Sequence, residues 1–125
     1  MKFIETDNAL KPMGHYSQAI VHNDIIYLSG QLAIDPVTGK KKFGSIEQET
    51  LCVLKNIELI LNEAGSDMNH VLKANLYIPD IALWDNVNEV YTNFLGNHKP
   101  ARSIIPTNDL HFGFKIEIDI IAVIK

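Results

Sequence analysis

The sequence predicts a single α+β domain, residues 1–125, in which two helices cover one face of a mixed six-stranded sheet. Three observations support this prediction. Six segments have the composition or alternation of strands, two segments repeat apolar residues at helical spacing, and the two helices are set among the strands in the order of the chain. Because two helices cannot cover both faces of a sheet, we expect the uncovered face to pack against other copies of the chain.

Three short strands are expected first. A strand at 3–4 precedes a hairpin whose strands span 18–22 and 25–29. Asn23-Asp24 connects the two strands of the hairpin. A two-residue connection of this kind predicts a tight turn, because Asn and Asp both tolerate positive φ.

Two helices are expected from their end signals and apolar spacing. Ser45 is the predicted N-cap of the first helix, and Gln48 completes a capping box. Apolar residues then recur every three or four positions as far as Gly65, a residue type that favours helix ends. A second apolar stripe with the same spacing runs from Trp84 to a stop at Gly96.

The remaining strands are expected at 70–78, 101–105 and 116–124. The last of them alternates most clearly, with one face that is apolar throughout. Its other face begins polar and becomes apolar from Ile121 onward. This change indicates a packing partner on the second face, in line with contact between copies.

Composition argues against several classes of protein. Fifteen acidic and eleven basic side chains give a net charge of −4, which disfavours nucleic acid as a partner. The single Cys52 excludes an internal disulfide, and no His or acidic cluster predicts a metal site. No nucleotide or hydrolase motif is present, so no cofactor is expected. The absence of a long apolar run and of a signal segment predicts a cytoplasmic protein without membrane contact.

A few polar residues lie next to apolar strand ends. Arg102 opens one such strand, where a buried guanidinium is unfavourable unless an anion meets it. The others are Tyr16, Ser29, Gly30, Gln31 and Asp119. Each also has a purely structural interpretation, such as an ion pair of Arg102 with Asp119 or Glu117. Spacing alone leaves both interpretations open.

Four ordered stretches, MGHYSQAI, YLSGQLAIDPVTGK, VNEVYTNFLGNHKPARS and KIEIDIIAV, resemble the RidA/YjgF family of reactive-intermediate imine deaminases. The resemblance runs from about Glu5 to Val123 without a large insertion. It implies a chorismate-mutase-like fold of the RidA type and a homotrimer whose sheets form an inner barrel. It also implies pockets between subunits and hydrolysis of 2-imino acids, formed from 2-aminoacrylate-type enamines, to 2-keto acids and ammonia.

The same resemblance implies roles for single residues. Those expected to contact a 2-imino or 2-keto acid are Tyr16, Ser29, Gly30, Gln31 and Arg102. Arg102 is expected to bind the carboxylate of the substrate. Asp119 falls on the final acidic position, where the family usually has glutamate, and is our candidate for positioning water or moving a proton. His15 and His111 also depart from the family pattern and are expected near the pocket.

Two other functions stay open at this point. One is a non-catalytic trimer that binds a small metabolite and regulates a partner protein, which the shorter Asp119 slightly favours. The other is ribonuclease activity or inhibition of translation, attributed to some relatives. The acidic net charge and the absence of an aromatic and basic stripe argue against it.

Overall fold

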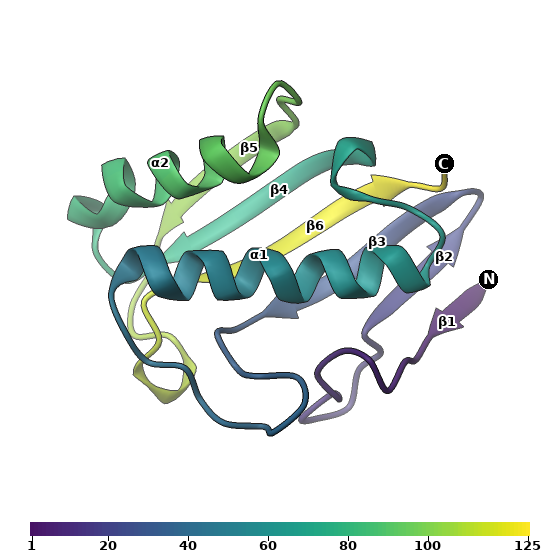
Figure 1. Ribbon diagram of the computed structural model, residues 1–125, viewed down its shortest axis with the longest axis horizontal. Helices are drawn as coiled ribbons and strands as arrows, with labels where there is room; N and C mark the ends of the chain where they lie inside the picture. The colour runs from purple at the N-terminus through teal and green to yellow at the C-terminus, as the bar shows by residue number, and fades with distance from the viewer.

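The computed structural model describes residues 1–125. It shows a six-stranded sheet with both helices on one face (Figure 1). The strands are β1 (Lys2–Ile4), β2 (Ala19–His22), β3 (Ile25–Gln31), β4 (Val71–Ile78), β5 (Ala101–Pro106) and β6 (Glu117–Val123). The helices are α1 (Ile46–Glu63) and α2 (Trp84–Leu95). The spatial order is β1-β2-β3-β6-β4-β5, and only β4 and β5 run parallel. The predicted α+β arrangement is therefore confirmed.

The hairpin of β2 and β3 closes at the predicted turn. Asn23 and Asp24 have φ of 50° and 64°, the left-handed pair that a two-residue type I′ turn requires. His22 pairs with Ile25 directly beside the turn. The sequence signal was sufficient here because the turn depends only on its own residues.

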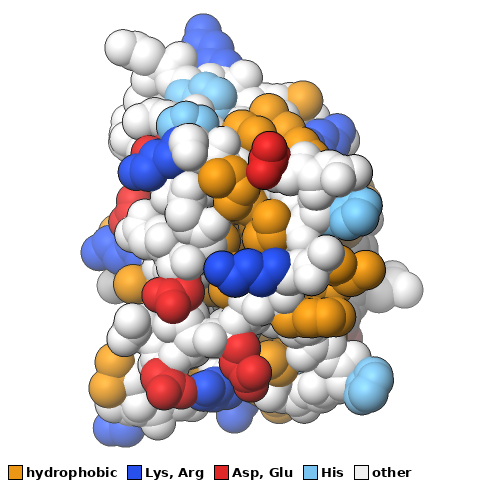
Figure 2. Space-filling model, turned by 90° about the vertical axis from the view of Figure 1, so that its right-hand side faces the viewer, with side chains coloured by type: hydrophobic (Ala, Val, Ile, Leu, Met, Phe, Trp, Pro, Cys, Tyr) orange, Lys and Arg blue, Asp and Glu red, His pale blue; other side chains and the backbone are white.

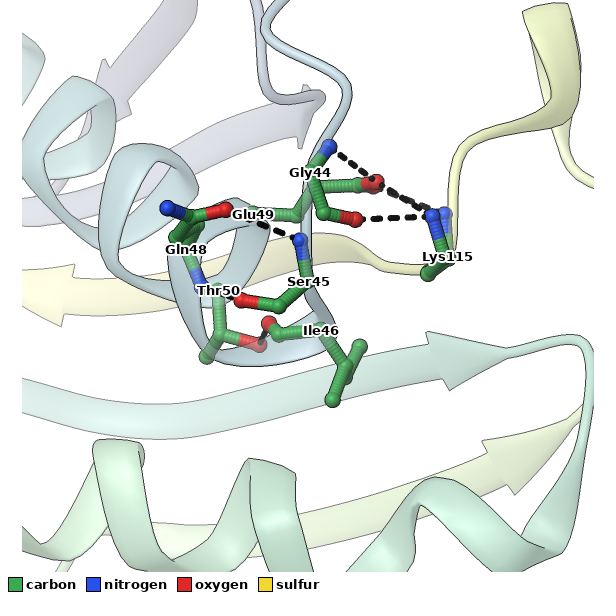
Figure 3. Close-up of polar contacts among 7 residues, drawn as sticks. All are labelled: Gly44, Ser45, Ile46, Gln48, Glu49, Thr50 and Lys115. Atoms are coloured by element: carbon green, nitrogen blue, oxygen red, sulfur yellow. Dashed lines mark hydrogen bonds and ion pairs between the residues drawn. The ribbon is translucent and has the colours of Figure 1, made fainter.

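The start of α1 and the ends of both helices lie where the sequence signals indicate. Ser45 Oγ accepts the backbone N–H of Gln48 at 3.1 Å, and Gln48 Oε1 accepts the N–H of Ser45 at 3.0 Å (Figure 3). This reciprocal pair is the predicted capping box. Gly65 follows α1 with φ of 84°, and Gly96 follows α2 with φ of 64°. No helix of the molecule combines the length and hydrophobicity that crossing a membrane requires.

Each strand differs from its predicted bounds by one or two residues, and at β4 and β3 the difference has a clear physical cause. β4 begins at Val71 because His70 closes a 3₁₀ turn, where its Nδ1 lies 2.6 Å from Asp67 Oδ1. β3 continues to Gln31, beyond the predicted end, through a β-bulge that lies between Leu28 and Gln31. A bulge adds an unpaired residue to one strand, and the alternation of side chains does not reveal it.

The two faces of the sheet have different surroundings. Ile118, Ile120 and Ala122 of β6 are buried beneath the helices. The opposite side of the sheet, which we call the open face, carries no helix (Figure 1). Its side chains include Tyr27, Ser29, Asn75, Tyr77, Ser103, Ile105, Glu117, Asp119 and Ile121. Most of them are half-buried in the single chain.

An ion pair between a buried glutamate and a partly exposed lysine connects α1 to the start of β6 (Figure 3). The Glu49 side chain has no exposed surface, and its Oε1 accepts the backbone N–H of Lys115 at 2.8 Å. Lys115 Nζ donates to Glu49 Oε2 at 3.1 Å and to the carbonyl oxygen of Gly44 at 2.8 Å. These bonds hold the residue two places before β6, and therefore fix the point at which that strand enters the sheet.

Candidate functional site

The residues predicted to contact a ligand surround two separate cavities. The first, which we call the arginine cavity, has a volume of about 370 Å³ and lies between α2 and the start of β5. Its lining includes Asn88, Tyr91, His98, Lys99 and Arg102. The second, which we call the bulge cavity, has a volume of about 390 Å³ and lies at the end of β3. Its lining includes Tyr16, Ser29, Gly30, Gln31, His111 and Glu117.

Register and neighbouring rings determine where the Arg102 side chain lies. Arg102 pairs with Ala74 of β4, which is buried under the helices, so the arginine projects toward the helical side of the sheet. Its Nη1 donates to Asn88 Oδ1 at 2.7 Å. Its Cζ lies 5.0 Å from the ring centroid of Tyr91 and 5.5 Å from that of Trp84, within the range of cation–π attraction.

No carboxylate pairs with Arg102. The ion pairs of the molecule do not include it, so the pairing with Asp119 or Glu117 that spacing left open does not occur. The hydroxyl of Tyr91, beside it, is buried without a hydrogen-bond partner. Burial raises the pKa of Tyr91, and the positive charge of Arg102 opposes that rise. A small anion in this cavity would meet a cation that the protein itself leaves uncompensated.

Four of the predicted substrate-contacting residues come together at the bulge cavity. The pairs Leu28 with Ile120 and Gln31 with Ile118 leave both Ser29 and Gly30 opposite the single Asp119. The remaining one, Tyr16, reaches the same cavity from the segment before β2. The bulge therefore presents three consecutive residues to a cavity that Tyr16 joins from a distant part of the sequence.

The hydroxyl of Ser29 is already bonded to the main chain. Ser29 Oγ donates to the carbonyl oxygen of Ser17 at 2.6 Å, and its N–H donates to the carbonyl oxygen of Gln18 at 3.0 Å. Ser29 thus lines the cavity and also connects the bulge to the segment that carries Tyr16. The Ser29 hydroxyl hydrogen is therefore already used, and a ligand in this cavity would accept hydrogen bonds from other groups.

Gly30 leaves room for the carboxylate of Glu117, which was not among the predicted site residues. A Cβ on Gly30 would lie 2.6 Å from Glu117 Oε1, well inside van der Waals contact. Only glycine leaves this space for the glutamate. Burial is the main cause that raises the pKa of Glu117, the charge of Asp119 adds to it, and His111 opposes it. The signal was present in the sequence, because residues 117 and 119 share a face of an alternating strand.

Asp119 is held by neighbours on the open face. Its Oδ1 accepts Asn75 Nδ2 at 2.9 Å. A hydrogen bond to Asp119 is also the main cause that raises the pKa of Tyr77. Since Arg102 projects to the other side of the sheet, the two residues predicted to be catalytic do not meet within one chain.

The wall of the bulge cavity is fixed by a buried amide. Gln18 is 1% exposed; its Nε2 donates to the carbonyl oxygens of Thr6 and Leu10 at 3.0 Å each, and its Oε1 accepts the N–H of Thr6 at 2.7 Å. Tyr16 Oη accepts the N–H of Met13 at 3.1 Å. The sequence placed Gln18 at the start of a strand and did not indicate this bonding role, because its partners are distant in the chain.

The two histidines that depart from the family pattern are placed differently. His111 lies in the turn before β6 and lines the bulge cavity. His15 lines an adjacent shallow hollow, together with Tyr27 and Ile20 of the hairpin. His111 therefore shares the bulge cavity with four of the predicted substrate-contacting residues, whereas the hollow of His15 shares Tyr16 and Ser29 with them.

Known proteins are similar to this chain in sequence and in fold over nearly its whole length. The family model described as Endoribonuclease L-PSP matches residues 6–124. A RutC family protein of Pyrococcus horikoshii is 42% identical over 119 residues, which make up 95% of this chain and 94% of that protein. A Rattus norvegicus protein named 2-iminobutanoate/2-iminopropanoate deaminase is 38% identical over 122 residues, or 98% and 89% of the two chains. The crystal structure of E. coli TdcF with bound serine has a TM-score of 0.93, 30% identity and full coverage of both chains.

Proposed function

Because this chain belongs to the endoribonuclease L-PSP family, with RutC and RidA proteins among its relatives, we propose that it is a 2-iminobutanoate/2-iminopropanoate deaminase-like enzyme. Its substrates are reactive 2-imino acids that arise from 2-aminoacrylate-type enamines. Its products are the corresponding 2-keto acids and ammonia. The names and identities of the relatives support the general activity, and the geometry around Arg102 supports the class of substrate.

The observation that carries this proposal is the uncompensated guanidinium of Arg102. One of its N–H groups is taken by Asn88, and no carboxylate of the protein pairs with it. A guanidinium binds a carboxylate through two parallel N–H···O bonds, a geometry that lysine cannot reproduce. The arginine cavity beside it, at about 370 Å³, accommodates a small organic acid.

We further propose that the complete site forms between copies of the chain in a homotrimer. The cavity beside Arg102 and the bulge cavity share no lining residue, so one copy does not bring both to the same ligand. The open face carries half-buried apolar side chains such as Ile121, which contact with another copy would cover. Arg102 of one copy then faces the bulge cavity of the next.

The proposed reaction needs orientation and proton transfer more than a strong nucleophile. Water adds to the electrophilic imine carbon, which gives a carbinolamine. The carbinolamine then loses ammonia to leave the keto acid. Asp119 positions the water or accepts its proton, and the peptide groups at Gly30 and Gln31 steady the reacting nitrogen or the water. Arg102 contributes by holding the carboxylate in one orientation.

The test is an assay of ammonia release from freshly generated 2-aminoacrylate. Arg102→Ala is expected to abolish acceleration over the uncatalysed reaction, while circular dichroism shows an unchanged fold. Arg102→Lys retains the charge and loses the fork, so we expect most of the acceleration to be lost as well. Lys55→Ala removes an exposed cation of α1 and serves as the control. Full acceleration in folded Arg102→Ala would rule out the carboxylate clamp.

One observation favours a second candidate function, a non-catalytic protein that binds a small metabolite. The carboxylate of Asp119 already accepts a hydrogen bond from Asn75 at 2.9 Å, which leaves it less free to handle a proton. Saturable binding of amino or keto acids without faster ammonia release would favour this alternative over the enzyme.

A further inference from the structure

The arginine cavity is bordered by a buried donor that no group of the protein meets. Tyr91 is 7% exposed, and its hydroxyl is buried without a hydrogen-bond partner. A buried hydroxyl without an acceptor bears the full cost of its removal from water. Because such groups are rare in folded proteins, this one points to an acceptor that comes from outside the chain.

Two contacts of α2 hold the ring of Tyr91 beside Arg102. Asn88 and Tyr91 lie three residues apart on the helix, so they project from the same face. Asn88 accepts one N–H of the guanidinium at 2.7 Å, and the ring centroid of Tyr91 lies 5.0 Å from its Cζ. The hydroxyl therefore has a defined place next to the cation.

The lining of the arginine cavity supplies donors and positive charge but no acid. Besides Arg102 it contains His98 and the exposed Lys99, and no aspartate or glutamate borders it. Burial raises the pKa of Tyr91 against the opposing charge of Arg102, so the hydroxyl keeps its proton at neutral pH. A cavity of this composition favours an anionic group that accepts hydrogen bonds.

We propose that the Tyr91 hydroxyl donates a hydrogen bond to the same ligand carboxylate that Arg102 holds. The identity of the ligand as a 2-imino or 2-keto acid rests on the proposed function, whereas the need for an acceptor rests on the unmet hydroxyl. The hydroxyl is covered in the empty cavity, so binding requires side chains of the lining to shift. Thr92 and Lys99 are exposed there, and rotamer changes of this kind are common on binding.

A donor to the carboxylate acts on binding and not on the chemical step. The carboxylate has the same charge in the 2-imino acid, in the transition state and in the 2-keto acid, so one hydrogen bond stabilises all three alike. Uniform binding of this kind lowers KM and leaves kcat unchanged. Loss of the hydroxyl is therefore expected to raise KM alone.

The test is Tyr91→Phe, which removes the hydroxyl and keeps the ring beside Arg102. Pyruvate is the probe, and its affinity is measured by NMR titration of the intact protein. We expect pyruvate to bind about tenfold to a hundredfold more weakly, the scale of one hydrogen bond to a charged group. KM for imine hydrolysis should rise by a similar factor, with kcat changed by about twofold or less.

Urea unfolding at equal protein concentration separates this role from a structural one. Tyr91→Phe is expected to lose no stability, because the hydroxyl has no partner in the protein. Tyr27→Phe makes the same change at a half-exposed ring of β3 and is the matched control for both measurements.

Three results would overturn the assignment of Tyr91. They are the absence of saturable pyruvate binding by the wild type, an unchanged pyruvate affinity in folded Tyr91→Phe, and a loss of stability in that variant. The last would mean that the hydroxyl bonds to the protein or to another copy of it. If Tyr91→Phe weakens pyruvate binding but the wild type does not accelerate hydrolysis, the proposed enzyme fails and the Tyr91 assignment stands. If the wild type accelerates hydrolysis and Tyr91→Phe changes neither KM nor pyruvate affinity, only the Tyr91 assignment fails.

Discussion

Arg102 is oriented by residues that come from a different element. Asn88 accepts one of its N–H groups, and the rings of Tyr91 and Trp84 flank its guanidinium. All three lie on α2, so the helix fixes the direction of a side chain on β5. A guanidinium stacked in this way loses less entropy when it binds a carboxylate than a free side chain would.

Gly30 is expected to be intolerant of even one added methyl group. In Gly30→Ala the new Cβ would lie 2.6 Å from Glu117 Oε1, so the carboxylate must move. Displacement on this scale costs about 10- to 100-fold in turnover when a catalytic or binding group is affected. The measurement is imine hydrolysis by folded protein. Gly14→Ala is the control, because its Cβ would lie at an ordinary 3.5 Å from Tyr16. Equal turnover in both variants would contradict this role for Gly30.

Glu117 is expected to make stability depend on pH. Burial raises its pKa above the ordinary value of 4.5, so the native state binds this proton more tightly than the unfolded chain does. Its contribution is therefore fully present below the unfolded pKa, and it is lost as pH rises through the folded pKa. Urea unfolding between about pH 4 and about pH 7 should show a smaller loss of stability in Glu117→Gln than in the wild type. Identical pH profiles would mean that the carboxylate is solvated like that of an unfolded chain.

Contacts between elements determine where β6 enters the sheet. Lys115 bonds through both its N–H and its ammonium to Glu49 of α1, and Glu117 follows two residues later. The N-terminus of α1 is fixed by its own capping box at Ser45 (Figure 3). The helix and the strand are therefore joined at the end of the molecule nearest the bulge cavity.

Breaking this connection should reduce the free energy of unfolding. Glu49→Gln has one oxygen in place of two, so it cannot accept both the N–H and the ammonium of Lys115, and we expect a loss of about 2 kcal/mol, the scale of hydrogen bonds to a charged group. Glu47→Gln, exposed on the same helix, should change stability by less than about 0.5 kcal/mol. Urea denaturation of both variants gives the comparison. A loss in Glu49→Gln no larger than in the control would mean that the ion pair contributes nothing net.

At the scale of the whole molecule, the distribution of charge bears on the family description. That description names an endoribonuclease, whereas this chain has a net charge of −4. On the face near the two termini, acidic and basic side chains are interspersed among apolar ones and form no continuous basic surface (Figure 2). Binding of RNA depends on neutralising many phosphates, so this surface does not favour it.

The assembly proposed above predicts that two inactive variants restore each other. Arg102→Ala lacks the clamp, and the double variant Glu117→Gln/Asp119→Asn lacks both carboxylates of the open face. In mixed trimers a site with both sets of groups forms wherever the second variant supplies arginine to the first. At equal concentrations this happens at about a quarter of sites, so co-refolded protein should recover about that share of wild-type activity. Each variant refolded alone is the control, and no recovery on mixing would place the whole site within one chain.

Much of the fold followed from local signals. The turn at Asn23-Asp24 and the capping box at Ser45 depend on residues within a few positions of one another, and both formed as predicted. The alternation of β6 correctly separated its buried face from the open face. The bulge in β3 and the 3₁₀ turn that ends at His70 did not follow, because each is a departure from the period on which the prediction relied.

The sequence by itself determined which elements form, which faces are apolar and which residue types are available for chemistry, because these properties depend on neighbours along the chain. Tertiary structure decided that Arg102 projects to the helical side while Asp119 lies on the open face, that Glu117 occupies the space above Gly30, and that the Gln31 oxygen has no donor. These features depend on strand register and on contacts between distant segments. A shift of register by one residue would reverse each face, and neither composition nor spacing reports that register.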